Sequence, residues 1–145
     1  MHHGARHRAN PEATLHRPSK PMAQWRVGLL TTAGAYVEGQ EPFDIEDIHG
    51  DPTMRVIPDD VDLSTIRFAH SHYDTDRAAE DPNVVLPIDP LHALVADGVV
   101  GSSSPVHVRM MGFNPDPIRI IESTAHEVVD TFANAGVDAV VLSPG

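Results

Sequence analysis

The feature that most constrains the fold of this chain is a long amphipathic segment followed directly by an apolar run. Asp116 to Ala135 carries helix signals at both ends, because Asp116 can cap a helix, Pro117 suits its first position and Gly136 can end it. Val137 to Leu142 reads Val-Asp-Ala-Val-Val-Leu. An almost wholly apolar run after a helix is typical of a central parallel strand buried on both faces. We therefore predict an α/β fold.

Two more strands and a second helix follow from similar patterns. Gln24 to Thr32 and Pro105 to Met110 are predicted strands. Asp89 is the predicted N-cap of a helix that begins at Pro90 and ends at Gly98. Together these elements predict a three-layer domain with a mostly parallel sheet.

Both predicted helices present an apolar face at helical spacing, which should pack on the sheet. In the second helix this face leaves His92 exposed and consists of Leu91, Leu94 and Val95. In the long helix the stripe consists of Ile118, Ile121, Ala125, Val128, Val129 and Phe132.

The domain organisation follows from composition. Residues 1–22 hold four histidines, several arginines and three prolines but few apolar residues, so we predict a flexible or partner-docked N-terminal arm. Residues 23–145 form a single α/β domain in this prediction. Within it, Glu38 to Asp62 is rich in Pro, Gly and acidic residues and predicts a long loop, which Phe43 could anchor to the core.

Charge and cysteine content exclude several classes of function. The formal net charge of −11 argues against nucleic acid and anionic membrane surfaces. The sequence shows neither a membrane span nor a secretory signal, so we expect a soluble cytoplasmic protein. Because the chain has no cysteine, it offers no disulfide, no thiolate metal ligand and no thiol nucleophile.

The densest group of chemically active residues follows a short predicted strand that ends at Arg67 to Ala69. His70, His72 and Asp74 alternate along the chain, so an extended backbone would point all three in one direction. Two imidazoles and a carboxylate could then move protons, hold a polar substrate or bind a metal. The alternative is a polar strand end whose histidines bond to the backbone.

Further candidates lie elsewhere in the predicted sheet and loops. Thr31, Thr32 and Gly34 lie at the carboxyl end of the first predicted strand, where ligands bind in open α/β sheets. Asp81 follows the histidine segment closely and could fold back towards it. The full set of candidate substrate-binding residues is Thr31, Thr32, Gly34, Glu41, Asp81 and His107.

A series of short motifs gives the chain a resemblance to a known family. In order, they are Thr31-Thr32-Ala33-Gly34, Glu41-Pro42-Phe43, Gly50-Asp51-Pro52, His70-Ser71-His72-Tyr73-Asp74, Glu80-Asp81-x-Asn83 and Gly98-Val99-Val100-Gly101. From about Trp25 to its end, the chain resembles the selenoprotein B family of glycine, sarcosine, betaine and D-proline reductases.

The resemblance implies a substrate pocket but an incomplete catalytic apparatus. Members reductively cleave a carbon–nitrogen bond α to a carboxyl group, using a selenocysteine or cysteine beyond the strand that corresponds to Val137 to Leu142. This chain has neither residue. We therefore expect a hetero-oligomer in which a second subunit with a Cys- or Sec-containing half supplies the nucleophile and covers the open sheet edge. The substrate would be a small molecule.

Two alternatives remain open at the level of sequence. In the first, His70, His72 and Asp74, with or without His107, hold a divalent metal such as zinc or iron. In the second, the chain is a non-catalytic subunit that stabilises a catalytic partner. The reductase reading assigns His70 and His72 to acid–base catalysis or substrate anchoring, with Asp74 orienting one imidazole.

Overall fold

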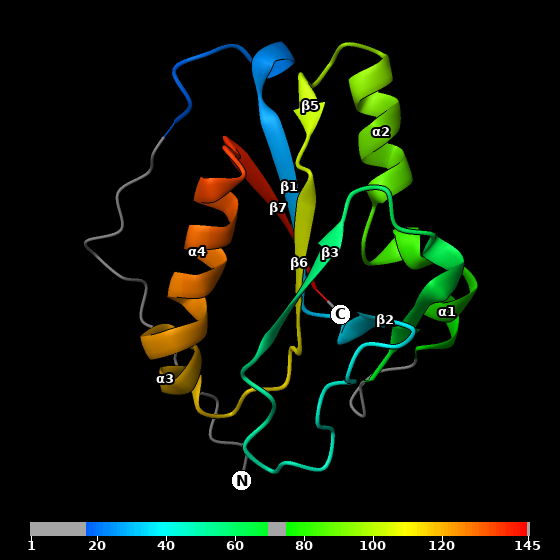
Figure 1. Cartoon of the computed structure of the whole chain (residues 1–145), viewed down its shortest axis with the longest axis vertical. Coiled ribbons are helices and arrows are strands. Elements are labelled where there is room, and N and C mark those ends of the chain that lie inside the picture. The colour runs from blue at the N-terminus through cyan, green and yellow to red at the C-terminus, as the bar shows by residue number, and fades with distance from the viewer. Residues whose placement is uncertain (1–16, 70–74, 145) are drawn as a thin grey trace, which may run out of the picture.

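A computed structural model of the chain describes residues 17–69 and 75–144. A curled, mostly parallel sheet lies between helices on its two faces (Figure 1), which confirms the predicted α/β fold with three layers. In the described ranges, no helix is long and apolar enough to cross a membrane.

The sheet is built around β1 (Arg26–Thr31). On one side, β1 pairs in parallel with β5 (Ser102–Ser103) near its start and with β6 (Val106–Met110) near its end. On the other side it pairs in parallel with β7 (Ala139–Ser143). The remaining strand, β3 (Met54–Pro58), is antiparallel to β6 and lies within the segment predicted as a long loop.

A small second sheet lies near the carboxyl end of β1. It pairs β2 (Ala35–Val37) with β4 (Ile66–Phe68) in antiparallel register. Here β4 confirms the short strand expected before the histidine segment. Short helical turns complete this region: η2 (Leu63–Thr65), α1 (Asp76–Glu80) and η3 (Pro82–Val84). A further turn, η1 (Met22–Gln24), precedes β1.

The two longer helices cover opposite faces of the sheet (Figure 1). One is α2 (Ile88–Ala96), where Asp89 lies in the first turn and Pro87 is the N-cap, so the predicted cap was wrong. Asp89 is not a cap because its carboxylate instead accepts a hydrogen bond from the Asn83 amide at 2.9 Å. Gly98 follows this helix in the left-handed region at φ 71° and ends it as predicted.

The long helix is continuous but changes its hydrogen-bonding pattern part-way. It comprises α3 (Pro117–Arg119), a π-helical turn η4 (Ile120–Thr124) and α4 (Ala125–Asn134). The predicted ends are confirmed, since the Asp116 carboxylate accepts from the Ile118 amide and Gly136 follows the helix at φ 67°.

Each helical layer buries its own apolar cluster against the sheet. On the α2 face the cluster includes Val27, Leu29, Ile57, Leu86, Ile88 and Leu91. On the α4 face it consists mainly of Val108, Met110 and Phe132. Leu94, predicted to face the core, is 43% exposed because it lies on the outer side of α2.

The last strand differs from the prediction. Val140, Val141 and Leu142 are 37%, 48% and 70% exposed, so β7 is not buried on both faces. It pairs only with β1 among the described strands, which makes it an edge strand rather than a central one. Part of the predicted stripe on the long helix is also exposed, namely Ile118, Ile121 and Val129.

The described part of the N-terminal segment is attached to the domain. The Lys20 ammonium lies 2.8 Å from the Asp138 carboxylate, and the Trp25 indole donates to the Lys20 carbonyl at 2.7 Å. Residues 1–16 of the predicted arm lie outside the described residues.

Candidate substrate site at the carboxyl end of the sheet

The end of β1 places three predicted residues where parallel strands finish. The Thr31 side chain is fully buried, and its hydroxyl accepts a hydrogen bond from the Ala33 amide at 3.2 Å. Thr32 donates its backbone N–H to the Ser143 carbonyl at the end of β7. Gly34 donates to the Met110 carbonyl at the end of β6, and its φ of 67° suits glycine. The turn after β1 therefore joins the carboxyl ends of β1, β6 and β7.

The predicted catalytic residues His70, His72 and Asp74 lie outside the described residues. Ala69, the last described residue before them, donates its N–H to the Gly34 carbonyl at 2.9 Å. This bond fixes Ala69 beside the turn after β1. That the three side chains share a pocket stays a prediction.

A buried arginine that the sequence reasoning missed lies at the same end of the sheet. Arg109, on β6, pairs in register with Thr31 on β1 and is completely buried. Its Nη2 donates to the Gln40 side-chain oxygen at 2.8 Å and to the Val56 carbonyl at 3.0 Å. Its Nε and Nη1 have no hydrogen-bond partner within the described ranges.

The charge of Arg109 is also unbalanced. No carboxylate forms an ion pair with it in the part of the chain that the structure describes. Burial lowers the pKa of Arg109 to about 10, and the nearby Arg55 cation lowers it in the same direction. The side chain is still protonated at pH 7, so the end of β6 holds a buried positive charge.

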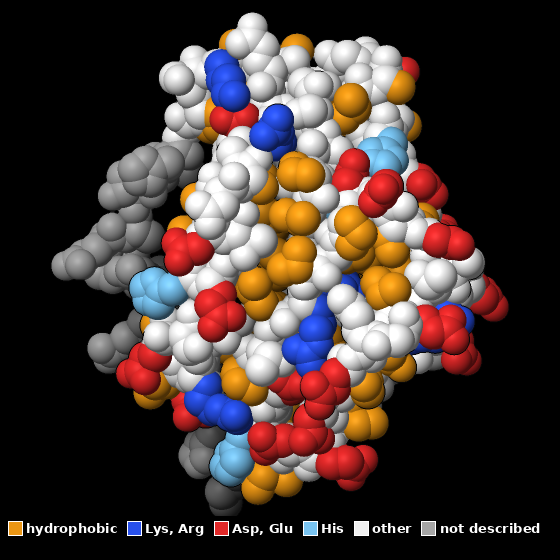
Figure 2. All heavy atoms as spheres, in the orientation of Figure 1, with side chains coloured by type: hydrophobic (Ala, Val, Ile, Leu, Met, Phe, Trp, Pro, Cys, Tyr) orange, Lys and Arg blue, Asp and Glu red, His pale blue; other side chains and the backbone are white. Residues whose placement is uncertain are grey.

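Arg55 connects this region with the loop that precedes β3. Its guanidinium lies 4.5 Å above the Phe43 ring and donates to the Glu41 carbonyl at 3.1 Å. Phe43 is buried, which agrees with the predicted anchoring of the loop. The Glu41 side chain is exposed. Figure 2 shows acidic side chains spread over the right and lower parts of this face, with few basic ones among them.

Asp81 has a clear structural role. Its carboxylate accepts the Asn83 backbone N–H at 3.0 Å and caps η3, while the Asn83 amide also bonds Asp89. Asp81 lines a hollow of about 400 Å³ between η2, β4 and α1. Its predicted contact with substrate stays a prediction.

His107 belongs to a buried polar network under α2. The Leu29 N–H donates to His107 Nδ1 at 3.1 Å, so Nε2 carries the proton and donates to Asp59 at 2.8 Å. The same Asp59 oxygen lies 2.9 Å from His92 Nε2 and accepts the Ser103 hydroxyl at 2.6 Å. This one carboxylate oxygen therefore ties β5, β6 and α2 to the end of β3.

The network shifts the pKa values of its members. Burial alone would raise the pKa of Asp59, but the hydrogen bonds from Ser103, His107 and His92 outweigh burial and lower it. Burial lowers the pKa of His107 despite the adjacent carboxylate. His107 is fully buried, and both its ring nitrogens are engaged.

The described residues offer no ready-made metal centre. In the ranges 17–69 and 75–144, no group of three or more His, Asp or Glu side chains could hold an ion. The metal alternative predicted for His70, His72 and Asp74 falls outside these ranges.

Comparison with known proteins identifies the family. The model of the glycine/sarcosine/betaine reductase selenoprotein B family matches residues 10–144, which include every strand of the domain. The chain belongs to this family. No solved structure matches it.

Two curated relatives in this group are much longer than the chain. It is 31% identical over 127 residues to D-proline reductase subunit gamma of Acetoanaerobium sticklandii, covering 88% of this chain and 51% of the relative. It is 27% identical over 129 residues to glycine reductase complex component B subunit gamma of Symbiobacterium thermophilum, covering 87% and 30%. The chain thus spans about half the length of one relative and a third of the other.

The sequence itself holds a signal that could have singled out Arg109. This residue alternates with Val106, Val108 and Met110 and lies on the opposite face of a strand in which four residues are buried. A charged residue inside a buried strand is rare unless it is paired or functional. That signal could have placed Arg109 among the candidates.

Proposed function

We propose that this chain is a subunit of an amino-acid reductase whose substrate pocket lies at the carboxyl ends of β1 and β6. Two relatives are named as subunits of D-proline reductase and of the glycine reductase complex. Both names refer to substrates that carry a carboxylate at neutral pH. A substrate of this class needs a positive charge in its pocket.

The observation that carries the proposal is the buried charge of Arg109 at this end of the sheet. Its guanidinium has no acidic partner among the described residues and two unsatisfied donors. In a region of low dielectric constant, such a charge attracts a carboxylate much more strongly than it would in water. Thr31, Thr32 and Gly34 form the neighbouring wall of the proposed pocket.

The proposed reaction is the reductive cleavage of a carbon–nitrogen bond. A selenolate or thiolate from a second polypeptide attacks the α-carbon and forms a carbon–selenium or carbon–sulfur bond. The carbon–nitrogen bond breaks, and its electron pair leaves with the nitrogen. That nitrogen takes a proton from the imidazolium of His70 or His72, which Asp74 orients. A dithiol reductant then supplies the electron pair that releases the carbon, which takes a proton, and the dithiol becomes a disulfide.

In this proposal the nucleophile comes from a second polypeptide, since these 145 residues contain no cysteine. The proposal therefore places the chain in a hetero-oligomer with a Cys- or Sec-containing subunit. It also places the reaction in the cytoplasm, where thiols and selenols stay reduced.

The other predicted substrate residues take peripheral places in this proposal. The exposed Glu41 side chain and Asp81, which lines a hollow, would lie at the rim of the pocket. We assign His107 a structural role instead, because both ring nitrogens are already bonded.

The test is the activity of the native complex on glycine, sarcosine, betaine and D-proline with a dithiol reductant. We expect His72→Ala to reduce kcat by about 100-fold or more with an unchanged circular dichroism spectrum. His49→Ala is the matched control, since its side chain is exposed and outside the proposed pocket. Full activity of His72→Ala would refute the proposed role of His72. Activity that needs a divalent metal but no second polypeptide would support the metal-dependent alternative.

A further inference from the structure

The free edge of the main sheet has the character of an interior strand. β7 pairs through one side with β1, and no described strand pairs with its other side. Its apolar side chains are exposed on both faces: Val140 and Leu142 on the α4 face, and Val141 on the opposite one. A strand that is apolar on both faces is typical of a parallel sheet covered on both sides.

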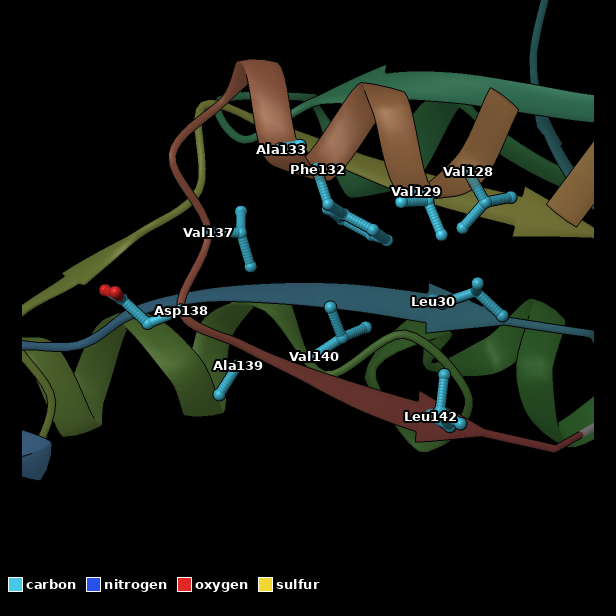
Figure 3. Close-up of a pocket in the computed structure, with 10 residues that line it drawn as sticks. All are labelled: Leu30, Val128, Val129, Phe132, Ala133, Val137, Asp138, Ala139, Val140 and Leu142. Carbon is cyan, nitrogen blue, oxygen red and sulfur yellow. The ribbon is translucent and has the colours of Figure 1, made fainter. Parts of the chain in front are cut away.

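An apolar groove runs between this strand and the long helix. Figure 3 shows Val128, Val129 and Phe132 pointing down from α4, while Val140 and Leu142 point up from β7 towards them. The groove encloses about 390 Å³, and Asp138 is the one charged residue among those that line it. Val129 is 65% exposed and Leu142 is 70% exposed, so the two rims are open.

We propose that β7 and this groove bind the second subunit of the reductase complex, which adds a strand parallel to β7 and inserts apolar side chains between α4 and β7. This inference rests on the proposed function. Two relatives are named as subunits of reductase complexes. Because β7 is apolar on both faces, the occupant should supply a parallel strand that continues the sheet.

A second copy of this chain fits the surface less well. With a net charge of −11, two copies repel each other. A two-fold axis would also pair β7 with itself in antiparallel fashion, whereas apolar residues on both faces are typical of parallel pairing. A different polypeptide need not carry the same negative charge, and it can pair with β7 in parallel.

The experiment measures binding of the second subunit of the native complex, identified by mass spectrometry and then produced as a separate chain. We expect Leu142→Asp and Val129→Asp each to weaken its Kd by about 100-fold, because each buries a carboxylate in the apolar groove. Ile48→Asp, at a side chain that is 78% exposed and outside the groove, should change Kd by less than about threefold. Thermal melts establish that the variants fold. If Val129→Asp does not fold, the milder Val129→Ser takes its place.

Amide exchange in the native complex gives a second readout. Backbone N–H groups of residues 139–143 should exchange at least tenfold more slowly in the complex than in the free chain. Unchanged exchange there, together with unchanged Kd values, would overturn the docking site even if the complex is an active reductase. Protection of β7 in a complex without reductase activity would instead refute the proposed function and leave the docking site standing. A homodimer that Leu142→Asp dissociates would overturn the proposal in favour of a second copy.

Discussion

At the scale of single residues, Arg109 opposes the folding of the chain. A buried donor without a partner costs about 1–3 kcal/mol, and Arg109 has two such atoms in the described structure. Its two acceptors do not depend on it, because Gln40 also accepts from the Val37 N–H and the Val56 carbonyl also accepts from the Gln40 amide. The residue is therefore expected to serve function rather than stability.

Replacing Arg109 should separate its effect on stability from its effect on substrate binding. We expect Arg109→Met to raise the free energy of unfolding by about 1–3 kcal/mol, while it raises the KM of the complex for a carboxylate substrate about tenfold or more. Urea unfolding and steady-state kinetics measure the two quantities. Arg119→Met, at a partly exposed arginine that bonds carbonyls of the loop before β3, serves as the control for charge removal. A variant that is less stable yet unchanged in KM would contradict the assignment.

The network of Asp59 and His107 predicts how stability depends on pH. Burial holds the pKa of His107 below its ordinary value of 6.5, so between the two values the unfolded chain binds the extra proton. Stability should therefore fall as pH decreases from 6.5 towards the folded pKa. The folded pKa of Asp59 is also lowered, so its contribution is complete above 3.8 and is lost as pH falls through the folded value.

Urea unfolding at pH 7.5, 5.5 and 3.5 checks both windows. His107→Gln should remove much of the change between pH 7.5 and 5.5, because glutamine can bond Leu29 and Asp59 without titrating. An unaltered pH profile in that variant would assign the dependence to other groups.

At the scale of elements, the approach of α4 to β1 depends on Gly28. A Cβ atom built on Gly28 would lie 2.6 Å from Cε1 of the Phe132 ring, closer than real Cβ contacts. The absence of a side chain at Gly28 therefore lets Phe132 fill the space between the helix and the central strand.

Gly28→Ala should destabilise the domain by about 1–3 kcal/mol through overpacking. Phe132→Leu in the same chain should recover part of this loss, because the smaller side chain makes room for the methyl group. Urea unfolding of the two single variants and the double variant forms the test. Additive losses would show that the contact between Gly28 and Phe132 is not the cause.

Sequence patterns predicted the helices better than the sheet. Asp116, Pro117 and Gly136 mark both ends of the long helix, because caps are local chemistry. β3 was missed for two reasons: its pairing with β6 is long-range, and the residues that surround it are rich in proline and acidic side chains. An apolar run such as β7 reads alike at the edge and the centre of a sheet, since the pattern does not show which neighbours are present.

The candidate site was predictable in part for similar reasons. Sequence patterns placed Thr31, Thr32 and Gly34 correctly at the carboxyl end of the first strand, because strand ends are read from local patterns. That they bind substrate stays a prediction. Asp59 was not singled out, because nothing in Pro58-Asp59-Asp60 indicates that three distant side chains converge on one of its oxygens. Arg109 was overlooked because its complete burial and its two unpaired donors are visible only in the structure.

At the scale of the whole molecule, self-association of this acidic chain should depend on the salt concentration and on the apolar side chains of the edge strand β7. We expect the isolated chain to form larger species as salt screens its net charge of −11. Val141→Lys should suppress them, because a lysine on an edge strand opposes edge-to-edge pairing. Light scattering at 50 mM and 500 mM salt measures the effect. Equal association of both proteins would mean that β7 does not mediate it.

The pairing of β1 with β7 also determines how long β1 stays incompletely paired while the chain is synthesised. Arg26 at its start and Asp138 beside β7 are in contact, although 112 residues separate them. At about 5–20 residues per second, a ribosome needs roughly 6–22 s to make the intervening chain. The first strand of the main sheet must therefore wait, with one side unpaired, for the last strand to emerge. Slower translation of the segment between them would lengthen the time during which a nascent chain depends on chaperones.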